Sequence, residues 1–600
     1  MKKFGLFFII IVSLTVLITI AGGRKKKPII QSNVTKMLTP LQEPDLSGAT
    51  VGDWVIKQEM SDAEKLNPVV TNDATADEII SYYLFEKLLE QDRITYELYP
   101  QLAKNMPTLS EDHLTYTFEL KDNVKFSDGT PLTGEDIIFT FKAIKNPFTD
   151  AQALRNYFTD LDRVELVDGD KYKVKFTFKQ PYFRAIYAIG DIKIVPKKIL
   201  DIENINDRLS WEMLNEANET LDPAKYPEMK KFADFLNQED VSRNPKYVVG
   251  SGPYKLEKWV TGQQISVVRN NDYWNKDEGK VYPEKIIWRT ISDQNAAIAA
   301  AKNKETDLMY VIRPIDFVEN VKNPEQFGLK KALVLEPVYS YIGWNNNSPL
   351  FNDPKVRMAM SYAVDRNMII DKIFYGMGIP IQSHIFYKSQ YVDSTLPVIP
   401  FDLEKSKELL AEAGWKDTDG DGILDKVING QKVDFKFTFT NNNNPTRKQT
   451  ALVIIDALKQ IGIQADIQDY EWSVFLDKVK KHDFDAAIMA WQLSVGPEDP
   501  YQIWHSSQAD GEGSNHISYK NQRSDELIEL NRITFDDSVR KEILNEWQEI
   551  IYKDQPYTFL WTPTGRYLYS DRFKNTRWYS YPNSPLMKEW WSSRDLARYK

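Results

Sequence analysis

A strand–helix–strand pattern between residues 433 and 470 constrains the fold of this 600-residue chain more than any other feature. VDFKFTFT at 433–440 and IQADIQDY at 463–470 have the composition and spacing of strands. Between them, NNNNPT indicates a loop and RKQTALVIIDALKQIG a helix. Two strands joined by a helix form a βαβ unit, whose crossover should be right-handed. The sequence therefore predicts an α/β fold, in which ligands gather where strands end and loops begin.

Length and composition limit the class of protein. About 550 residues follow the polar N-terminal region, which is too many for one core, so we expect two or three domains. An apolar content of 42% and a charged content of 27% are typical of soluble globular domains. The net charge of −10, with mixed signs, gives no basic face for nucleic acid. The absence of cysteine excludes disulfides and thiolate metal sites.

The N-terminus has the pattern of an export signal. Two lysines precede an apolar run from Phe4 to Ala21. Gly23 stands where a lipoprotein would carry its cysteine, so no lipid anchor can form there. Residues 1–23 are then a cleaved signal or an uncleaved anchor, and the basic cluster at 24–27 counts against an outward-facing anchor. We expect residues 24–45, which are polar and contain prolines, to be a flexible tether and the protein to be extracytoplasmic.

Several stretches, in a shared order, resemble those of one family. They include LNPVVTNDATADEIISYYLFEKLLEQD, LTYTFELKDNVKFSDGTPLTGEDIIFTF and GSGPYKLEKW in the first half of the chain. NNNSPLFNDPKVRMAMSYAVDR, KELLAEAGW and FDAAIMAW followed by DP continue the likeness in the second half. From about residue 50 to 600 the chain resembles the family-5 extracellular solute-binding proteins, which are peptide, nickel and oligosaccharide receptors of bacterial ABC importers.

The resemblance implies an α/β, two-lobed periplasmic-binding-protein fold with a hinge. Lobe I would comprise residues 46–312 plus 563–600, with a subdomain inserted at 78–247, and lobe II would comprise 313–562. Ligand contacts to both lobes would select a closed state, which a membrane permease would read. We expect a monomer.

The function implied is that of the extracytoplasmic solute-binding component of an ABC importer that captures oligopeptides between closing lobes. One alternative is a non-peptide solute, such as an oligosaccharide, in the same cleft. A hydrolase is the alternative from the enzyme class, but the sequence contains no Gly-x-Ser-x-Gly elbow, phosphate loop or cysteine nucleophile. We therefore expect no enzymatic activity and no required cofactor.

The resemblance also implies the residues that line the cleft. In peptide-binding members, the segment after the Asn-Pro element lies along the ligand backbone, and a tryptophan nineteen residues before the strand-end tryptophan lines a pocket. The segment around that second tryptophan would pair with the ligand by strand addition. The corresponding residues here are Asn72, Asp73, Ala74, Trp472, Ala490, Trp491, Gln492, Ser494 and, near the last hinge, Trp561. For each tryptophan the alternative is core packing.

Ser494 departs from the family pattern. Peptide-binding members place an aspartate there, which pairs with the free α-amine of the ligand, and a serine cannot neutralise an ammonium group. Two interpretations follow. Either Glu498 or Asp499 replaces the aspartate, or the ligand has no terminal amine to bind.

The sequence DTDGDGILD at 417–425 has the spacing of a calcium loop. Position 12 of such a loop should be acidic, but it is Ile428, which argues against a helix–loop–helix sensor. The alternatives are a structural calcium site and an Asp/Gly-rich turn without an ion. The candidate ligands are Asp417, Asp419, Asp421, Ile423 and Asp425.

Overall fold

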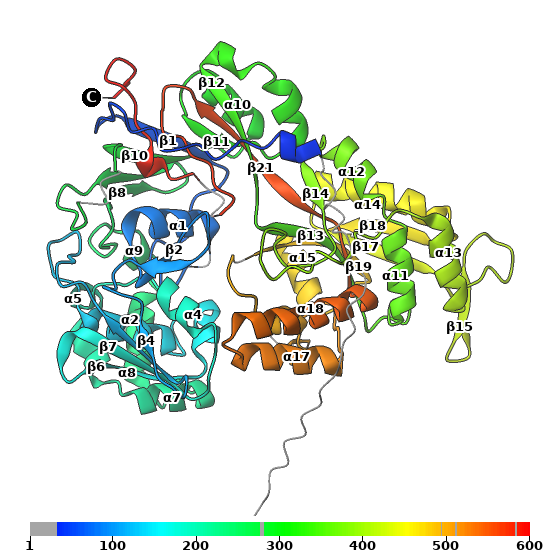
Figure 1. The fold of residues 1–600 in the computed structure, drawn as a ribbon, viewed down its shortest axis with the longest axis horizontal. Helices are drawn as coiled ribbons and strands as arrows, with labels where there is room; N and C mark the ends of the chain where they lie inside the picture. Colours follow the sequence, from blue (N-terminus) through cyan, green and yellow to red (C-terminus); the bar gives the residue numbers. More distant parts are fainter. Residues whose placement is uncertain are drawn as a thin grey trace, which may run out of the picture. The chain divides into compact units, whose positions relative to one another are not determined.

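Two β-sheets surrounded by helices form the two lobes (Figure 1). The residues that the computed structural model describes are 33–71, 73–276, 281–493, 495–509, 513–581 and 585–599. The strand order in the first sheet is β12-β21-β11-β1-β10-β9-β8, with β14 paired to β21. Its strands are β1 (Trp54–Glu59), β8 (Tyr254–Val260), β9 (Gln264–Arg269), β10 (Lys285–Thr290), β11 (Leu308–Tyr310), β12 (Leu329–Leu335), β14 (Gly378–Pro380) and β21 (Trp561–Ser570).

The second lobe is built on a sheet with the order β18-β17-β19-β13-β20. Its strands are β13 (Val338–Trp344), β17 (Lys436–Asn441), β18 (Gln464–Asp469), β19 (Ala486–Gln492) and β20 (Tyr557–Phe559). Its longer helices are α11 (Pro354–Tyr362), α12 (Arg366–Ile373), α13 (Leu403–Glu412), α14 (Pro445–Lys459), α15 (Trp472–Lys480), α17 (Gln522–Ile533) and α18 (Asp537–Asp554). β17 and β18 pair in parallel and α14 connects them, which confirms the predicted α/β fold.

Side-chain alternation along β19 explains why this strand is central to the second lobe. Ile488 packs with Trp344 and Phe439 in a core on one face of the sheet. Met489, the next residue, packs in a separate core on the other face with Tyr341. Because successive side chains of a strand point to opposite faces, one apolar strand serves two cores.

A subdomain inserted in the first lobe has its own four-stranded sheet, in the order β4-β5-β7-β6. Its elements include β4 (Thr108–Leu109), β5 (Thr115–Glu119), α2 (Gly134–Lys145), β6 (Leu161–Val167), β7 (Asp170–Phe178), α4 (Ala185–Asp191), α7 (Trp211–Thr220) and α8 (Pro227–Leu236). The hairpin of β2 (Leu89–Gln91) and β3 (Leu98–Pro100) lies beside it. Phe118 and Phe176 of this sheet share one apolar core with Ile286 and Tyr567 of the first sheet, so subdomain and lobe pack together.

Two short and neighbouring connections join strands of the two sheets, and β14, between β13 and β17 in the sequence, also pairs with the first sheet. β12 of the first sheet ends at Leu335 and β13 of the second begins at Val338. On the return, β20 ends at Phe559 and β21 begins at Trp561. The sequence places the lobe boundary at 312/313, whereas strand pairing keeps β12 in the first sheet and moves the crossing to 336–337.

The segment 33–45, expected to be part of a flexible tether, packs against the first lobe instead. Val34, in the short helix η1 (Asn33–Lys36), is fully buried in a core with Leu333. Thr39 exchanges two bonds with the backbone of Leu333: its N–H donates to the carbonyl at 2.8 Å, and its hydroxyl accepts from the N–H at 2.9 Å. Residues 24–32 of the expected tether, and the expected signal at 1–23, lie outside the described residues.

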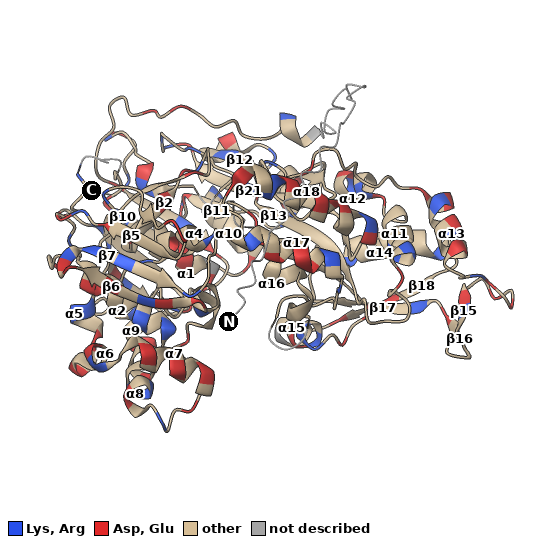
Figure 2. Ribbon diagram, turned by 60° about the horizontal axis from the view of Figure 1, so that its bottom comes forward, with Lys and Arg blue, Asp and Glu red and all other residues tan. Residues whose placement is uncertain are grey.

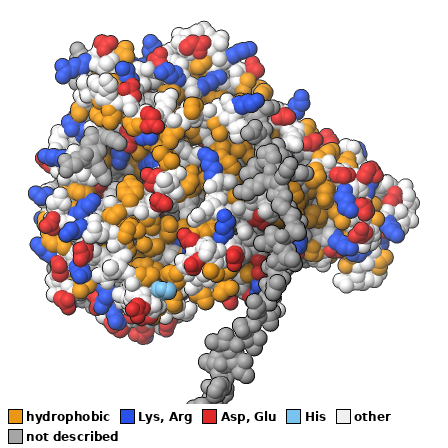
Figure 3. Space-filling model, in the orientation of Figure 1, with side chains coloured by type: hydrophobic (Ala, Val, Ile, Leu, Met, Phe, Trp, Pro, Cys, Tyr) orange, Lys and Arg blue, Asp and Glu red, His pale blue; other side chains and the backbone are white. Residues whose placement is uncertain are grey.

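Acidic and basic residues are interspersed on the helices of both lobes (Figure 2). On α17, for example, the Arg523 guanidinium donates to Glu526 at 3.1 Å and to Glu546 of α18 at 2.8 Å. Hydrophobic side chains spread over the middle of one face, between the elements of the two lobes (Figure 3). This apolar region makes the space between the lobes a candidate for ligand binding.

Candidate ligand-binding site between the lobes

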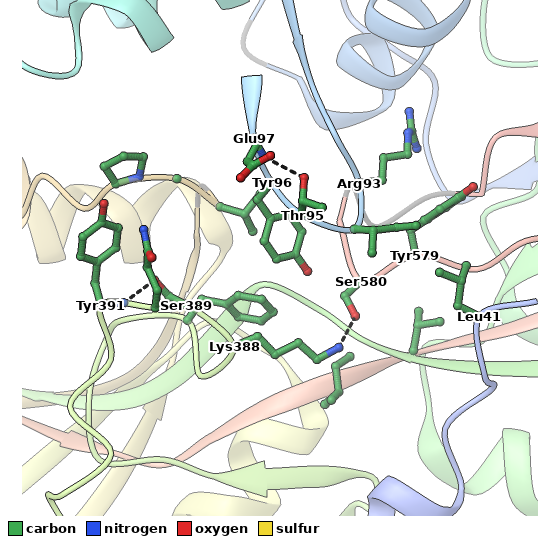
Figure 4. A pocket seen from close by; sticks show the side chains of 18 of the residues that line it. Leu41, Arg93, Thr95, Tyr96, Glu97, Lys388, Ser389, Tyr391, Tyr579 and Ser580 are labelled. Atoms are coloured by element: carbon green, nitrogen blue, oxygen red, sulfur yellow. Dashed lines mark hydrogen bonds between the residues drawn. The ribbon is translucent and has the colours of Figure 1, made fainter. Parts of the chain in front are cut away.

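A cavity of 580 Å³ lies between the two lobes (Figure 4). The first lobe contributes residues 93–97 and 578–580, and the second lobe contributes residues of the segments 386–391 and 495–498. The volume falls in the range of about 300–1,000 Å³ that is typical of small-molecule sites. A ligand in this cavity would touch both lobes.

Contacts across the cavity hold the lobes in a closed arrangement. Lys388 of the second lobe donates its Nζ proton to Ser580 Oγ at 3.2 Å (Figure 4). The rings of Tyr96 and Phe386 meet edge to face, with their centroids 6.3 Å apart. Because these pairs join different lobes, opening of the cleft would break them.

A second set of contacts, which we call the latch, joins the subdomain to the second lobe. The Tyr182 hydroxyl donates to Asp499 Oδ2 at 2.8 Å, and Arg532 Nε of α17 lies 3.3 Å from the same oxygen. The Arg532 guanidinium also stacks over the Tyr182 ring at 4.8 Å, and its carbonyl accepts the N–H of Phe183 at 3.0 Å. Burial and the Asp499 charge raise the pKa of Tyr182 well above its ordinary value, so the phenol keeps the proton it donates.

A second cavity adjoins the first one at the lobe boundary, and a third adjoins the second within the first lobe and its subdomain. One, of 200 Å³, shares Tyr187, Val495 and Gly496 with the cavity of 580 Å³. The other, of 290 Å³, shares Asp191 and Ile192 with the cavity of 200 Å³. Together they provide a continuous lining suited to an extended ligand.

Ion pairs line the cavities of 200 Å³ and 290 Å³. Lys87 Nζ lies 2.7 Å from Asp191 and 3.1 Å from Glu90, and Lys193 Nζ lies 3.4 Å from Asp77. Burial alone would raise the pKa of Asp191, but the ammonium groups of Lys193 and Lys87 outweigh it and hold the pKa well below its usual value. Asp191 therefore stays ionised, and its charge is already compensated.

The two acidic residues considered as replacements for the missing aspartate lie in different environments. Asp499 is engaged in the latch. Glu498 is only 8% exposed, and its Oε1 has no hydrogen-bond partner. Burial raises the pKa of Glu498 to about 7, although Arg184 acts in the opposite direction. His384 Nε2 lies 4.0 Å from Glu498, and burial lowers the pKa of His384 to about 3, so this imidazole is neutral at pH 7.

The strand-end residues implied by the resemblance lie together at the end of β19. Ala490 pairs with Ser340 of β13 and, like Gln492, is exposed. Trp491 is half-buried and stacks on His516, with ring centroids 5.9 Å apart. Ser494 lies outside the described residues, and the cavity lining begins one residue later, at Val495.

The implied backbone-binding segment of the first lobe lies at the start of α1 (Ala74–Ile79). Asp73 caps this helix by accepting the Ala76 N–H at 2.9 Å, and it lines the cavity of 290 Å³ together with Asp77. Ala74 is the first residue of the helix, and Asn72 lies outside the described residues.

The two remaining tryptophans differ in exposure. Trp472 begins α15, is 53% exposed and stacks on Phe475 with centroids 5.6 Å apart. Trp561 is 2% exposed and packs against Phe374, 4.8 Å away, in the core of the second lobe. The structure therefore places Trp561 in core packing, the alternative to a cleft wall.

The acidic loop brings three of its five candidate ligands together. Carboxylate oxygens of Asp417, Asp419 and Asp425 lie within 4.8 Å of one another. Asp421 instead accepts the Ile423 N–H at 2.8 Å. The Lys432 ammonium forms an ion pair with Asp419 and lies 3.5 Å from Asp425. A lysine thus supplies a positive charge to this loop.

Sequence reasoning missed the latch and most of the cavity lining. Tyr182, Phe183 and Tyr187 occur in one stretch, PYFRAIY at 181–187, whose density of aromatic residues is a weak signal for a binding surface. Their partners Asp499 and Arg532 are more than 300 residues away, and no local pattern connects the two segments.

Two sheet-based lobes, joined by adjacent connections and enclosing a cavity, define a two-lobed binding protein. A family model described as bacterial extracellular solute-binding proteins, family 5 Middle, matches residues 97–513. The chain belongs to this family, which confirms the resemblance and the predicted two-lobed fold. Within the described parts of residues 33–599, no helix combines the length and apolar character that a membrane span needs.

Relatives cover nearly the whole chain. Oligopeptide-binding protein AppA of Bacillus subtilis is 32% identical over 536 residues, which are 87% of this chain and 88% of that protein. Periplasmic oligopeptide-binding protein OppA of Salmonella typhimurium is 25% identical over 501 residues, 79% of this chain and 81% of its own. The structure of Bacillus subtilis AppA in complex with a nonapeptide has a TM-score of 0.72 at 29% identity and covers 91% of this chain and 100% of that one.

Proposed function

We propose that this protein captures oligopeptides between its two lobes as the extracytoplasmic solute-binding component of an ABC importer. The observation that carries the proposal is the cavity of 580 Å³ to which both lobes contribute. The likeness to an oligopeptide-binding protein over 87% of the chain supports peptides as the ligand.

The end of β19 offers a peptide a strand to pair with. β17 pairs with β19 only at Ala486 and Ala487, so the 490–492 end of β19 extends beyond this neighbour. Three residues further on, Val495 lines the cavity. Backbone pairing at such an edge binds peptides without regard to their side chains, as a transporter of mixed peptides requires.

The contacts between the lobes support capture by closure. The latch and the Lys388–Ser580 bond join the lobes, so a ligand that touches both would add to these contacts and select the closed state. Solution scattering should show a smaller radius of gyration with saturating peptide. An unchanged radius, with binding proven by calorimetry, would contradict closure.

One titration series tests the ligand class. It compares a bound peptide, its N-acetylated form and a panel of oligosaccharides by calorimetry. Because Ser494 cannot neutralise an amine, we expect acetylation to weaken binding less than tenfold. A loss of a hundredfold or more, about 2.7 kcal/mol, would reveal an amine clamp. Binding of sugars alone would replace peptides with the oligosaccharide alternative.

The remaining parts of the proposal concern the surroundings of the protein. We propose export by the N-terminal segment without lipidation at Gly23, a monomeric state, a membrane permease as partner, and no catalytic activity. Mass spectrometry of the native protein tests export without lipidation, and a full-length N-terminus in a soluble cytoplasmic fraction would contradict it. Cleavage products after incubation with peptides or oligosaccharides would contradict the proposed absence of catalytic activity.

The acidic loop is a separate, structural question. A calcium ion would be held by Asp417, Asp419 and Asp425, whose carboxylates already converge. The Lys432 ammonium supports the alternative, a turn that needs no ion. Calorimetry with calcium distinguishes the two, since a bound ion gives heat and raises the melting temperature.

A further inference from the structure

The cavity of 200 Å³ is lined mostly by aromatic and aliphatic side chains. Its lining is dominated by tyrosine rings and leucine side chains contributed by the first lobe and its subdomain, with two residues of the second lobe closing one side. The residues that matter most for its chemistry are Tyr157, Tyr182, Tyr187, Tyr581, Leu98 and Val495. The polar side chains at its wall are Lys87, Gln91, Arg184 and Asp191.

Tyr182, Gln91, Lys87 and Asp191 of this wall already have polar partners, which leaves mainly ring faces and edges for a ligand to contact. The Tyr182 hydroxyl donates to Asp499, and Lys87 and Asp191 pair with each other at 2.7 Å. An apolar cavity of about 150 Å³ is large enough to hold benzene. A cavity of 200 Å³ therefore admits an aromatic ring, which stacks favourably against tyrosines.

The cavity is complete only when the lobes are closed. Val495 and Gly496 belong to the second lobe, and the side-chain amide of Gln91, on β2, donates to the Val495 carbonyl. A methyl group added at Gly496 would lie 3.4 Å from the Tyr187 ring, which shows how closely the second lobe approaches this wall. A side chain that fills the cavity would therefore contact both lobes and favour closure.

We infer that this cavity is a specificity pocket for an aromatic side chain of the bound peptide. The inference rests on the proposed function and adds to it a preference at one ligand position. An acidic side chain should bind less well, because its carboxylate would lose water among tyrosine rings.

The test uses pentaalanine as host and five peptides in which one alanine is replaced by phenylalanine. A parallel set carries glutamate. Calorimetry should find one phenylalanine peptide that binds at least tenfold more tightly than pentaalanine, and the glutamate peptide of the same position should bind no better than the host.

Two variants test whether the preference for phenylalanine arises in this cavity. Ala188 of α4 lines this cavity and none of the other cavities described above, so Ala188→Leu places bulk inside it. The preference for a phenylalanine peptide over pentaalanine should disappear in Ala188→Leu. Tyr157→Ala, which removes part of the wall at a residue that is 46% exposed, should reduce the preference as well. Ala411→Leu, at an exposed position of α13, is the matched control.

The outcomes separate this inference from the function it rests on. If peptides bind but all five phenylalanine peptides match pentaalanine within twofold, the pocket assignment is wrong and peptide capture stands. A preference that persists in both Ala188→Leu and Tyr157→Ala also overturns the assignment. If neither pentaalanine nor any substituted peptide binds, the proposed function fails and this inference fails with it.

Discussion

Removal of one hydroxyl group from the latch should weaken ligand binding while the ring that lines the cavity of 200 Å³ stays in place. In Tyr182→Phe the ring keeps its place under the Arg532 guanidinium, but the donor to Asp499 is lost. Tyr182 is 9% exposed and so is the side chain of Asp499, so water replaces the bond poorly. A hydrogen bond to a charged group contributes about 1.5–3 kcal/mol.

This energy acts on the closed state alone, because the two partners belong to different lobes. If the free protein is mostly open, the whole loss of closed-state stability appears in the measured affinity for the ligand. Each 1.4 kcal/mol changes an equilibrium constant about tenfold. We therefore expect the peptide Kd of Tyr182→Phe to rise about 10-fold to 100-fold. The backbone bond between Phe183 and Arg532 remains, so closure should persist at saturation.

The assay is calorimetry with one peptide, combined with solution scattering at saturating peptide. Tyr254→Phe is the matched control, because the Tyr254 hydroxyl donates to the Pro283 carbonyl at 2.8 Å within the first lobe. It should lower the melting temperature and leave Kd unchanged. A wild-type Kd in Tyr182→Phe would refute the argument that the latch stabilises the closed state.

Three shorter predictions concern buried or clustered charges. Burial raises the pKa of Glu498 to about 7, so ionisation of this group destabilises the folded state as pH rises from about 4.5 to 7. The unfolding free energy of Glu498→Gln, measured in urea, should therefore increase relative to that of wild type by about 2–3 kcal/mol between pH 4.5 and 8. A difference that does not depend on pH would contradict this. Lys432→Met removes the ammonium beside Asp425 and should tighten calcium binding at least tenfold by calorimetry; equal heats in both proteins would count against it. Arg572→Met leaves the buried Asp53 without its ion-pair partner and leaves Asp307 with Arg598 alone, at 3.3 Å, and it should cost about 3–5 kcal/mol in unfolding free energy, whereas a loss below 1 kcal/mol would be unexpected.

The parts of the fold that sequence predicts are those encoded by neighbouring residues. The βαβ unit follows from alternation in β17 and helical spacing in α14, and both signals lie within forty residues of each other. The lobe boundary is different, because β12 belongs to the first sheet only through β21, more than 200 residues later. No local pattern records such a pairing. The segment 33–45 is similar, since its polar composition conceals the one buried anchor, Val34.

The candidate site also has one part that the sequence indicates and another that only the fold reveals. The family resemblance points to the end of β19 through its strand-end tryptophan, whereas the tyrosine-lined cavity combines residues from 87 to 581 that only the fold brings together. Trp561 illustrates the limit of residue type as evidence. A tryptophan near a hinge suits a cleft wall or a core equally well, and its packing on Phe374 depends on α12 and β21 meeting in space.

The brevity of the two connections between the sheets determines how the protein tolerates changes in chain length. Only Glu336 and Pro337 separate β12 from β13, and only Leu560 separates β20 from β21. A single residue inserted at Leu560 would have no loop to absorb it. It would shift the register of β21 by one and turn its buried side chains to the opposite face. Insertions and deletions should therefore be excluded from both connections, while the far ends of the lobes, such as the hairpin of β15 (Asp425–Ile428) and β16 (Gln431–Asp434), remain free to lengthen.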